Sequence, residues 1–220
     1  NFDIKNEIEV IPNFIDFTRF MKLDKEHFKK AIAPNKEKLL IHTSNFRKVK
    51  RVEDTIRIFH KVKQEVNSKL MLVGDGPERA CVEELARKLN VEKDVMFLGK
   101  QDAVEELLAI ADLYLMPSES ESFGLAALEA MACEVPVISS NTGGIPEINI
   151  QGDTGFLSDV GNVEEMALNA IKILSNEDAL KRFKTNSLIQ AKKFDIANIL
   201  PVYERYYEKV LKESAQFSKT

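Results

Sequence analysis

The stretch Leu70-Met71-Leu72-Val73-Gly74-Asp75-Gly76-Pro77-Glu78 joins a short apolar run to a glycine turn and then to a charged, helix-like segment. A continuous apolar run between turn residues is typical of a strand that is buried on both faces. Further apolar runs occupy residues 39–41, 95–98, 113–116 and 135–138, with a shorter one at 155–157. Helical spacing of apolar residues separates them, over about 52–66, 78–89, 104–109 and 123–132. This alternation predicts an α/β fold, a Rossmann-like doubly wound parallel sheet with helices on both faces.

Bulk properties exclude several classes of protein. A chain of 220 residues can form one large domain, and its net charge of −4 argues against a general nucleic-acid binder. Its three histidines are scattered, so we expect no metal site, and Cys81 and Cys133 are expected to be reduced thiols in the core. No apolar run reaches the ~18–20 residues of a membrane span, so we expect a cytoplasmic protein, and a homo-oligomer is compatible with the sequence.

The first strand-like run is followed by a cluster of cations. Ser44-Asn45-Phe46-Arg47-Lys48-Val49-Lys50-Arg51 holds four of them at the entry to a predicted helix. Ligands of doubly wound folds bind beyond the carboxyl ends of the strands. Arginine offers a bidentate fork and lysine a point charge, and both suit a diphosphate. We therefore favour phosphate binding over a solvated charge run.

Glycine turns follow three other runs. Gly74 and Gly76 come after residues 70–73, Gly99-Lys100-Gln101 after 95–98, and Gly143-Gly144-Ile145-Pro146-Glu147 after 135–138. Glycine lets the backbone come close to a ligand. None of these turns has the Gly-x-Gly-x-x-Gly spacing of dinucleotide-binding proteins, so NAD is not expected.

The most informative segment follows the run at 113–116. Glu121 and Glu129 bracket the start of a predicted helix whose first amides, near Phe123–Leu125, would be unpaired donors suited to a phosphate. Gly124 would leave room for the ligand. Helix capping would explain Glu121 but not Glu129, which lies two turns further on in an apolar segment. A carboxylate there needs hydrogen-bond donors, and sugar hydroxyls are suitable ones.

As a set, these motifs resemble the nucleotide-sugar-binding domain of retaining glycosyltransferases of the GT-B architecture, family 4 (group 1). The hallmark is the pair of glutamates, Glu121 and Glu129, separated by seven residues. The resemblance covers roughly residues 8–210 and includes these other strings: Gly74–Pro77, Phe97–Gly99, Pro117-Ser118, Glu129–Ala132, Pro136–Ile138, Gly143-Gly144 and Pro146-Glu147.

The resemblance implies that the chain is one half of a two-domain enzyme. Residues 1–20, which contain a strand-like 7–11 and then Pro12–Asp16, would cross over from a missing N-terminal acceptor domain. Residues 21–195 would form the Rossmann-like donor domain. Residues 163–213 read as helices, and the last, over 196–220, would pack back towards the missing domain. The chain begins at Asn1 rather than Met, and we accordingly expect a preceding part.

The resemblance also assigns roles. Glu129 would bind the ribose hydroxyls of the nucleotide, and Glu121 would face the donor sugar. The amides near Phe123–Leu125, with Arg47 and Lys50, would hold the diphosphate and stabilise the charge of the leaving group. The turn at Gly99–Gln101 would lie near the base, and Ser44 and Gly74 would complete the nucleotide-sugar site.

Two positions depart from the family pattern. Ser44-Asn45 stands where Gly-Arg is common, and Arg47 comes two residues late, which makes Lys50 the stronger candidate. Glu134 stands where glycine usually ends the helix, and a non-glycine residue in a left-handed cap costs about 1–2 kcal/mol.

Within the family, Ser44–Arg51, Phe97–Asp102 and Glu119–Leu125 are most similar to members that act in bacillithiol biosynthesis. That similarity implies transfer of N-acetylglucosamine from UDP-N-acetylglucosamine to a small hydroxy acid such as L-malate. No Asp-x-Asp occurs, so we expect metal-independent transfer without a cofactor, and no transfer by this half alone. Alternatives are a sibling enzyme with a polysaccharide or lipid-linked acceptor, an ADP- or GDP-sugar donor, and a non-catalytic nucleotide-binding module.

Overall fold

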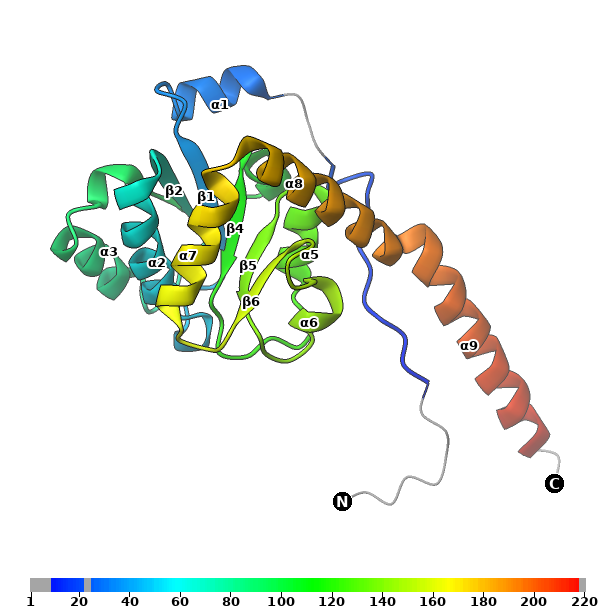
Figure 1. Ribbon diagram of the computed structural model, residues 1–220. Coiled ribbons are helices and arrows are strands. Elements are labelled where there is room, and N and C mark those ends of the chain that lie inside the picture. Colours follow the sequence, from blue (N-terminus) through cyan, green and yellow to red (C-terminus); the bar gives the residue numbers. More distant parts are fainter. Residues whose placement is uncertain (1–8, 22–24, 218–220) are drawn as a thin grey trace.

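The computed structural model describes residues 9–21 and 25–217 and contains one six-stranded sheet (Figure 1). Every strand pair is parallel, and the strand order is β3-β2-β1-β4-β5-β6. The predicted doubly wound Rossmann-like sheet is therefore confirmed. The strands are β1 (Lys38–Thr43), β2 (Ser68–Val73), β3 (Val95–Gly99), β4 (Leu113–Met116), β5 (Val137–Ser140) and β6 (Gly155–Ser158).

Helices cover both faces of this sheet. The α-helices are α1 (Glu26–Ile32), α2 (Val52–Glu65), α3 (Arg79–Lys88), α4 (Val104–Ile110), α5 (Leu125–Ala132), α6 (Ile145–Ile148), α7 (Val163–Leu174), α8 (Glu177–Ala191) and α9 (Ile196–Phe217). Short 3-10 helices span η1 (Lys48–Lys50), η2 (Glu92–Asp94) and η3 (Lys192–Phe194). The four-residue α6 was not expected, since the segment after residue 144 was interpreted as a flexible turn.

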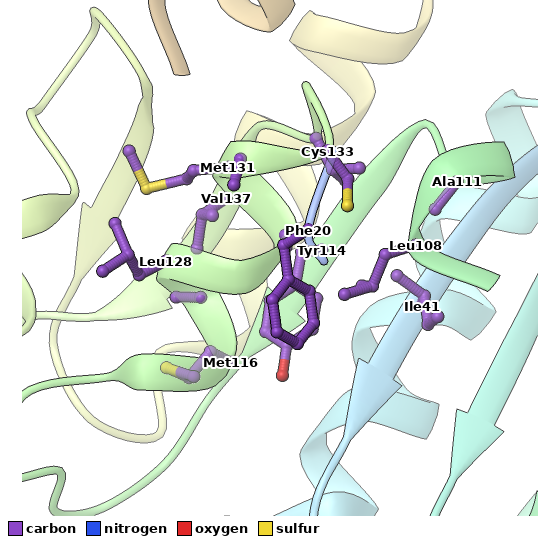
Figure 2. Close-up of a cluster of buried hydrophobic side chains, with 14 of the residues drawn as sticks. Phe20, Ile41, Leu108, Ala111, Tyr114, Met116, Leu128, Met131, Cys133 and Val137 are labelled. Atoms are coloured by element: carbon purple, nitrogen blue, oxygen red, sulfur yellow. The ribbon is translucent and has the colours of Figure 1, made fainter. Parts of the chain in front are cut away.

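Two hydrophobic clusters explain why the strands are apolar on both sides. Successive residues of a strand point to opposite faces. Leu39 and Ile41 accordingly pack with side chains of α4, α5 and α6, whereas Leu40 packs with those of α2, α3 and α7. Figure 2 shows part of the first cluster, where Phe20 of the N-terminal segment joins Tyr114 of β4. Docking of that segment therefore completes the core.

The N-terminal segment is anchored at the start of α9. The amide of Ile15 donates to the Phe194 carbonyl at 2.9 Å, and the amide of Ile196 donates to the Ile15 carbonyl at 2.9 Å. The rings of Phe14 and Tyr203 meet edge to face with centroids 6.1 Å apart. From there α9 runs away from the sheet (Figure 1). The strand predicted at 7–11 is wrong for residues 9–11, which form none, and residues 7 and 8 lie outside the described part.

A buried carboxylate joins elements at the amino ends of the strands. Asp112, at 3% exposure, accepts hydrogen bonds from Lys29 Nζ at 2.7 Å, Lys184 Nζ at 2.8 Å and the Leu39 amide at 3.0 Å. Burial raises the pKa of Asp112, but the charges of Lys184 and Lys29 outweigh it and hold that pKa below its usual range. This network ties α1, β1 and α8 together at the end of the sheet opposite the predicted ligand site.

Three further expectations can be compared with the structure. Cys133 is buried as expected, but Cys81 is exposed, because it lies on the outer side of α3. Glu134 has φ 60°, which confirms the left-handed conformation expected after α5. Among the described residues, no helix is both long and apolar enough to span a membrane.

Candidate active site

The strand order reverses between β1 and β4, and the predicted ligand residues gather there. Connections from β1 and β4 run to opposite sides of such a switch point, which leaves a crevice beyond the carboxyl ends of the strands. The loop that follows β1 meets the loop that follows β4, where the Glu119 amide donates to the Val49 carbonyl at 2.8 Å. Two candidate segments far apart in the sequence are thus held side by side.

A cavity of about 280 Å³ lies at this crevice, with an ion pair in its wall. Lys50 Nζ donates to Glu121 Oε1 at 2.6 Å, and Ser118 Oγ donates to the same oxygen at 2.8 Å. The side chains of Lys50 and Glu121 are 23% and 13% exposed. The pair expected from the sequence to serve the diphosphate and the sugar is therefore assembled in one place.

Of the four cations after β1, Lys50 is the one that lines this cavity. Its position is set by η1, where the Lys50 amide donates to the Arg47 carbonyl at 2.8 Å. Arg51, with φ 49°, turns away and pairs with Asp54 at 2.6 Å. The Arg47 side chain is exposed and is not among the residues that line the cavity. The structure thus agrees with the sequence in making Lys50 a stronger candidate than Arg47.

The start of α5 forms another part of the wall. Gly124 has φ 93° and precedes the first helical residue, Leu125, two positions later than the helix was expected to begin. The first amides of the helix therefore belong to Leu125 and Ala126, and both residues line the cavity. Phe123 contributes its side chain to the core, with its ring 5.6 Å from that of Phe194.

The loop after β5 supports the backbone of Glu121. The Gly144 amide donates to the Glu121 carbonyl at 3.2 Å. A Cβ on Gly143, which has φ 54°, would lie 1.8 Å from that carbonyl oxygen. These glycines are therefore required because two loops of the protein touch, and the contact fixes the position of the Glu121 backbone.

Gly74 has a comparable reason to be glycine. It has φ 122°, and an added Cβ would lie 1.8 Å from the Ser44 carbonyl oxygen. Gly74 therefore allows the backbone of Ser44 to come close, and not the ligand that was expected from the sequence. The Gly74 amide donates to the Gly99 carbonyl at 2.7 Å, while Lys100 and Gln101 are exposed beyond β3. These turn residues do not line the cavity and lie towards the β3 edge of the sheet.

Glu129 lies one helical turn beyond Leu125 and is half-buried. Its carboxylate accepts no hydrogen bond from any described residue. Burial raises the pKa of Glu129, the positive charge of Arg19 opposes that rise, and the negative charge of Glu105 adds to it. Glu129 is not among the residues that line the cavity, so its role in binding the ribose stays a prediction. A partly desolvated carboxylate without a donor would gain from a ligand that supplies one.

Several residues of the cavity escaped the sequence interpretation. His42, Thr43 and Asn13 line it. His42 is buried, and burial lowers its pKa to about 4, so the ring is neutral at pH 7. Its Nδ1 lies 2.8 Å from the Leu115 carbonyl, which can only accept, so Nδ1 carries the proton and Nε2 accepts from Ser44 Oγ at 2.8 Å. A histidine inside an apolar strand was the available sequence clue.

Comparison with known proteins identifies the family of this chain. The sequence matches the family described as glycosyl transferases group 1 over residues 24–189. N-acetyl-alpha-D-glucosaminyl L-malate synthase of Bacillus anthracis is 46% identical over 209 residues, which is 94% of this chain and 55% of that protein. The chain thus spans about half the length of the curated relatives it matches.

Solved structures share the fold. Sucrose-phosphate synthase from Thermosynechococcus elongatus superimposes with a TM-score of 0.84 at 24% identity, over 93% of this chain and 53% of that one. Anabaena HepE, solved in complex with UDP and glucose, gives a TM-score of 0.81 at 25% identity, over 91% of this chain and 56% of that one. The chain belongs to the group 1 family of glycosyltransferases and has the Rossmann-like fold of a GT-B enzyme.

Proposed function

We propose that this chain is the donor-binding half of a retaining glycosyltransferase that transfers N-acetylglucosamine from UDP-N-acetylglucosamine to a small hydroxy acid such as L-malate. The observation that carries the proposal is the Lys50–Glu121 pair beside the start of α5, at the switch point of the sheet. The 46% identity to the malate synthase supports the choice of sugar and acceptor.

In this proposal the donor lies across the carboxyl ends of β1 and β4. The diphosphate takes Lys50 and the first amides of α5 as partners, because a helix start carries partial positive charge. The sugar lies against Glu121, and the ribose hydroxyls donate to Glu129.

Catalysis would follow from electrostatic preorganisation. Charge that develops on the departing diphosphate meets a lysine and backbone amides already fixed by the fold. In this proposal positive groups would neutralise the diphosphate in place of a metal ion, so we expect metal-independent transfer. The acceptor would be bound mainly by the other half of the enzyme, and the chain alone should then not transfer sugar at a useful rate, because positioning of two reactants can be worth about 7–11 kcal/mol.

Titration calorimetry tests the proposal directly. UDP and UDP-N-acetylglucosamine should bind the 220-residue chain with and without EDTA. Preference for ADP or GDP would show that the donor is another nucleotide sugar, and strict dependence on Mg²⁺ would overturn metal independence. Incubation with the donor and malate, followed by mass spectrometry, tests transfer. Glycoside formed at the rate of a full-length relative would place the acceptor site inside this chain.

A further inference from the structure

The cavity that holds Lys50 and Glu121 is also lined by Asn13, which reaches it from the N-terminal segment. That segment is more than a hundred residues away from Glu121 in the sequence and belongs to neither strand-end loop. We propose that Asn13 binds the sugar of the donor and thereby helps to select it. This inference rests on the proposed function of the cavity.

The backbone around Asn13 is fixed in place. Ile15, two residues later, is 4% exposed and exchanges hydrogen bonds with the chain at the start of α9. The Tyr203 hydroxyl reaches the Pro12 carbonyl at 3.5 Å, and the ring of Pro12 restricts its own φ. The Phe194 ring, beside the Ile15 pairing, packs on Phe123 of the cavity loop. The position of Asn13 is therefore tied to the wall of the site.

The chemistry of Asn13 differs from that of the other polar groups in the cavity. Lys50 and Glu121 already bind each other, and Ser118 donates to the same carboxylate oxygen. No described residue hydrogen-bonds the Asn13 carboxamide, which offers two N–H donors and one carbonyl acceptor. A neutral amide suits hydroxyl and acetamido groups, whereas a diphosphate is better served by cations and helix amides. Asn13 is thus matched to the sugar part of the ligand.

Comparing UDP-N-acetylglucosamine with UDP, which lacks the sugar, distinguishes sugar binding by Asn13 from a purely structural role. Asn13→Ala should weaken binding of UDP-N-acetylglucosamine about 3- to 10-fold, the effect of losing a neutral hydrogen bond, and should leave UDP binding within twofold. Asn141→Ala is the matched control, because Asn141 is exposed like Asn13 but lies after β5 and does not line the cavity. It should change neither affinity.

Calorimetric titrations with both ligands decide the outcome, and melting temperatures check that the variants fold. Equal loss for UDP and UDP-N-acetylglucosamine, or no loss for either, would overturn the role of Asn13 while leaving the proposed donor site intact. A wild-type chain that bound neither ligand would contradict the proposed function itself, and this inference with it.

Discussion

Replacing Glu129 by glutamine should weaken nucleotide binding and at the same time stabilise the unliganded chain. The substitution keeps the shape of the side chain and removes its charge. In the structure this half-buried carboxylate has no hydrogen-bond donor among the described residues, and burial raises its pKa. The charge therefore opposes folding at pH 7 unless a ligand supplies hydrogen-bond donors.

The two effects differ in sign and can be estimated separately. Loss of charged hydrogen bonds to the ribose should cost about 1–3 kcal/mol of UDP binding, or roughly a 5- to 150-fold increase in Kd. Removing an unsatisfied charge at a functional site commonly adds about 0.5–2 kcal/mol of stability. We expect the lower half of that range, because Glu129 is only half-buried and the nearby charge of Arg19 already compensates in part. For a chain of this length that corresponds to a rise in Tm of about 1–5 °C.

Calorimetry with UDP and thermal unfolding without ligand measure both quantities on the same preparation. Glu147→Gln is a suitable control, because Glu147 is an exposed glutamate of α6 near the same end of the sheet. A Glu129→Gln variant with lower Tm and unchanged UDP affinity would refute the reasoning, since Glu129 would then be a structural residue.

Three other results are expected. UDP affinity should fall on acidification at a pH above the range of an ordinary glutamate, because the raised pKa of Glu129 makes it protonate early; titrations from pH 8 to 5 measure this, and a flat profile would contradict it. Asp112→Ala should lower the free energy of unfolding by about 3 kcal/mol in urea while sparing UDP binding, since it breaks a buried ion pair at the far end of the strands. A urea midpoint of Asp112→Ala equal to that of the wild type would contradict this role. Because the folded-state pKa of Asp112 is depressed, the stability that Asp112 provides should be present above about pH 4 and disappear below it. Gly143→Ala should lower both the Tm and the affinity for UDP-N-acetylglucosamine, because the added Cβ would displace Glu121. Gly152→Ala is the control: Gly152 has φ 74° but open space around an added Cβ, so this variant should lose Tm through backbone strain and keep its affinity. Equal losses of affinity in the two variants would contradict the role of the loop contact.

The sheet was predictable because both of its faces are covered. Burial on two sides imposes continuous apolar runs such as Leu70–Val73, and the carboxyl ends of parallel strands must meet at one edge. The sequence therefore predicted that Lys50 and Glu121 lie close together, and the structure places Lys50 Nζ 2.6 Å from Glu121 Oε1.

Other parts of the site depend on contacts that local patterns do not encode. Gly74 and Gly143 look like ligand turns, but each is glycine because a neighbouring loop touches it. The apolar pattern predicted that the helix begins near Phe123, but α5 begins at Leu125, after Gly124. The Phe123 ring instead packs in the core against Phe194. Asn13 reaches the cavity only because the segment that carries it pairs with the start of α9, a contact between residues far apart in the chain.

Because Lys50 is already paired with Glu121, we expect the cavity to bind small anions weakly. Inorganic phosphate would have to separate the two charges and leave the carboxylate without its counterion, at a cost of several kcal/mol for a partly buried pair. In the proposed function a nucleotide sugar would offer a new partner to each, a diphosphate to Lys50 and hydroxyls to Glu121. The ion pair would then disfavour phosphate and other simple anions and favour a ligand that carries both a diphosphate and hydroxyl groups.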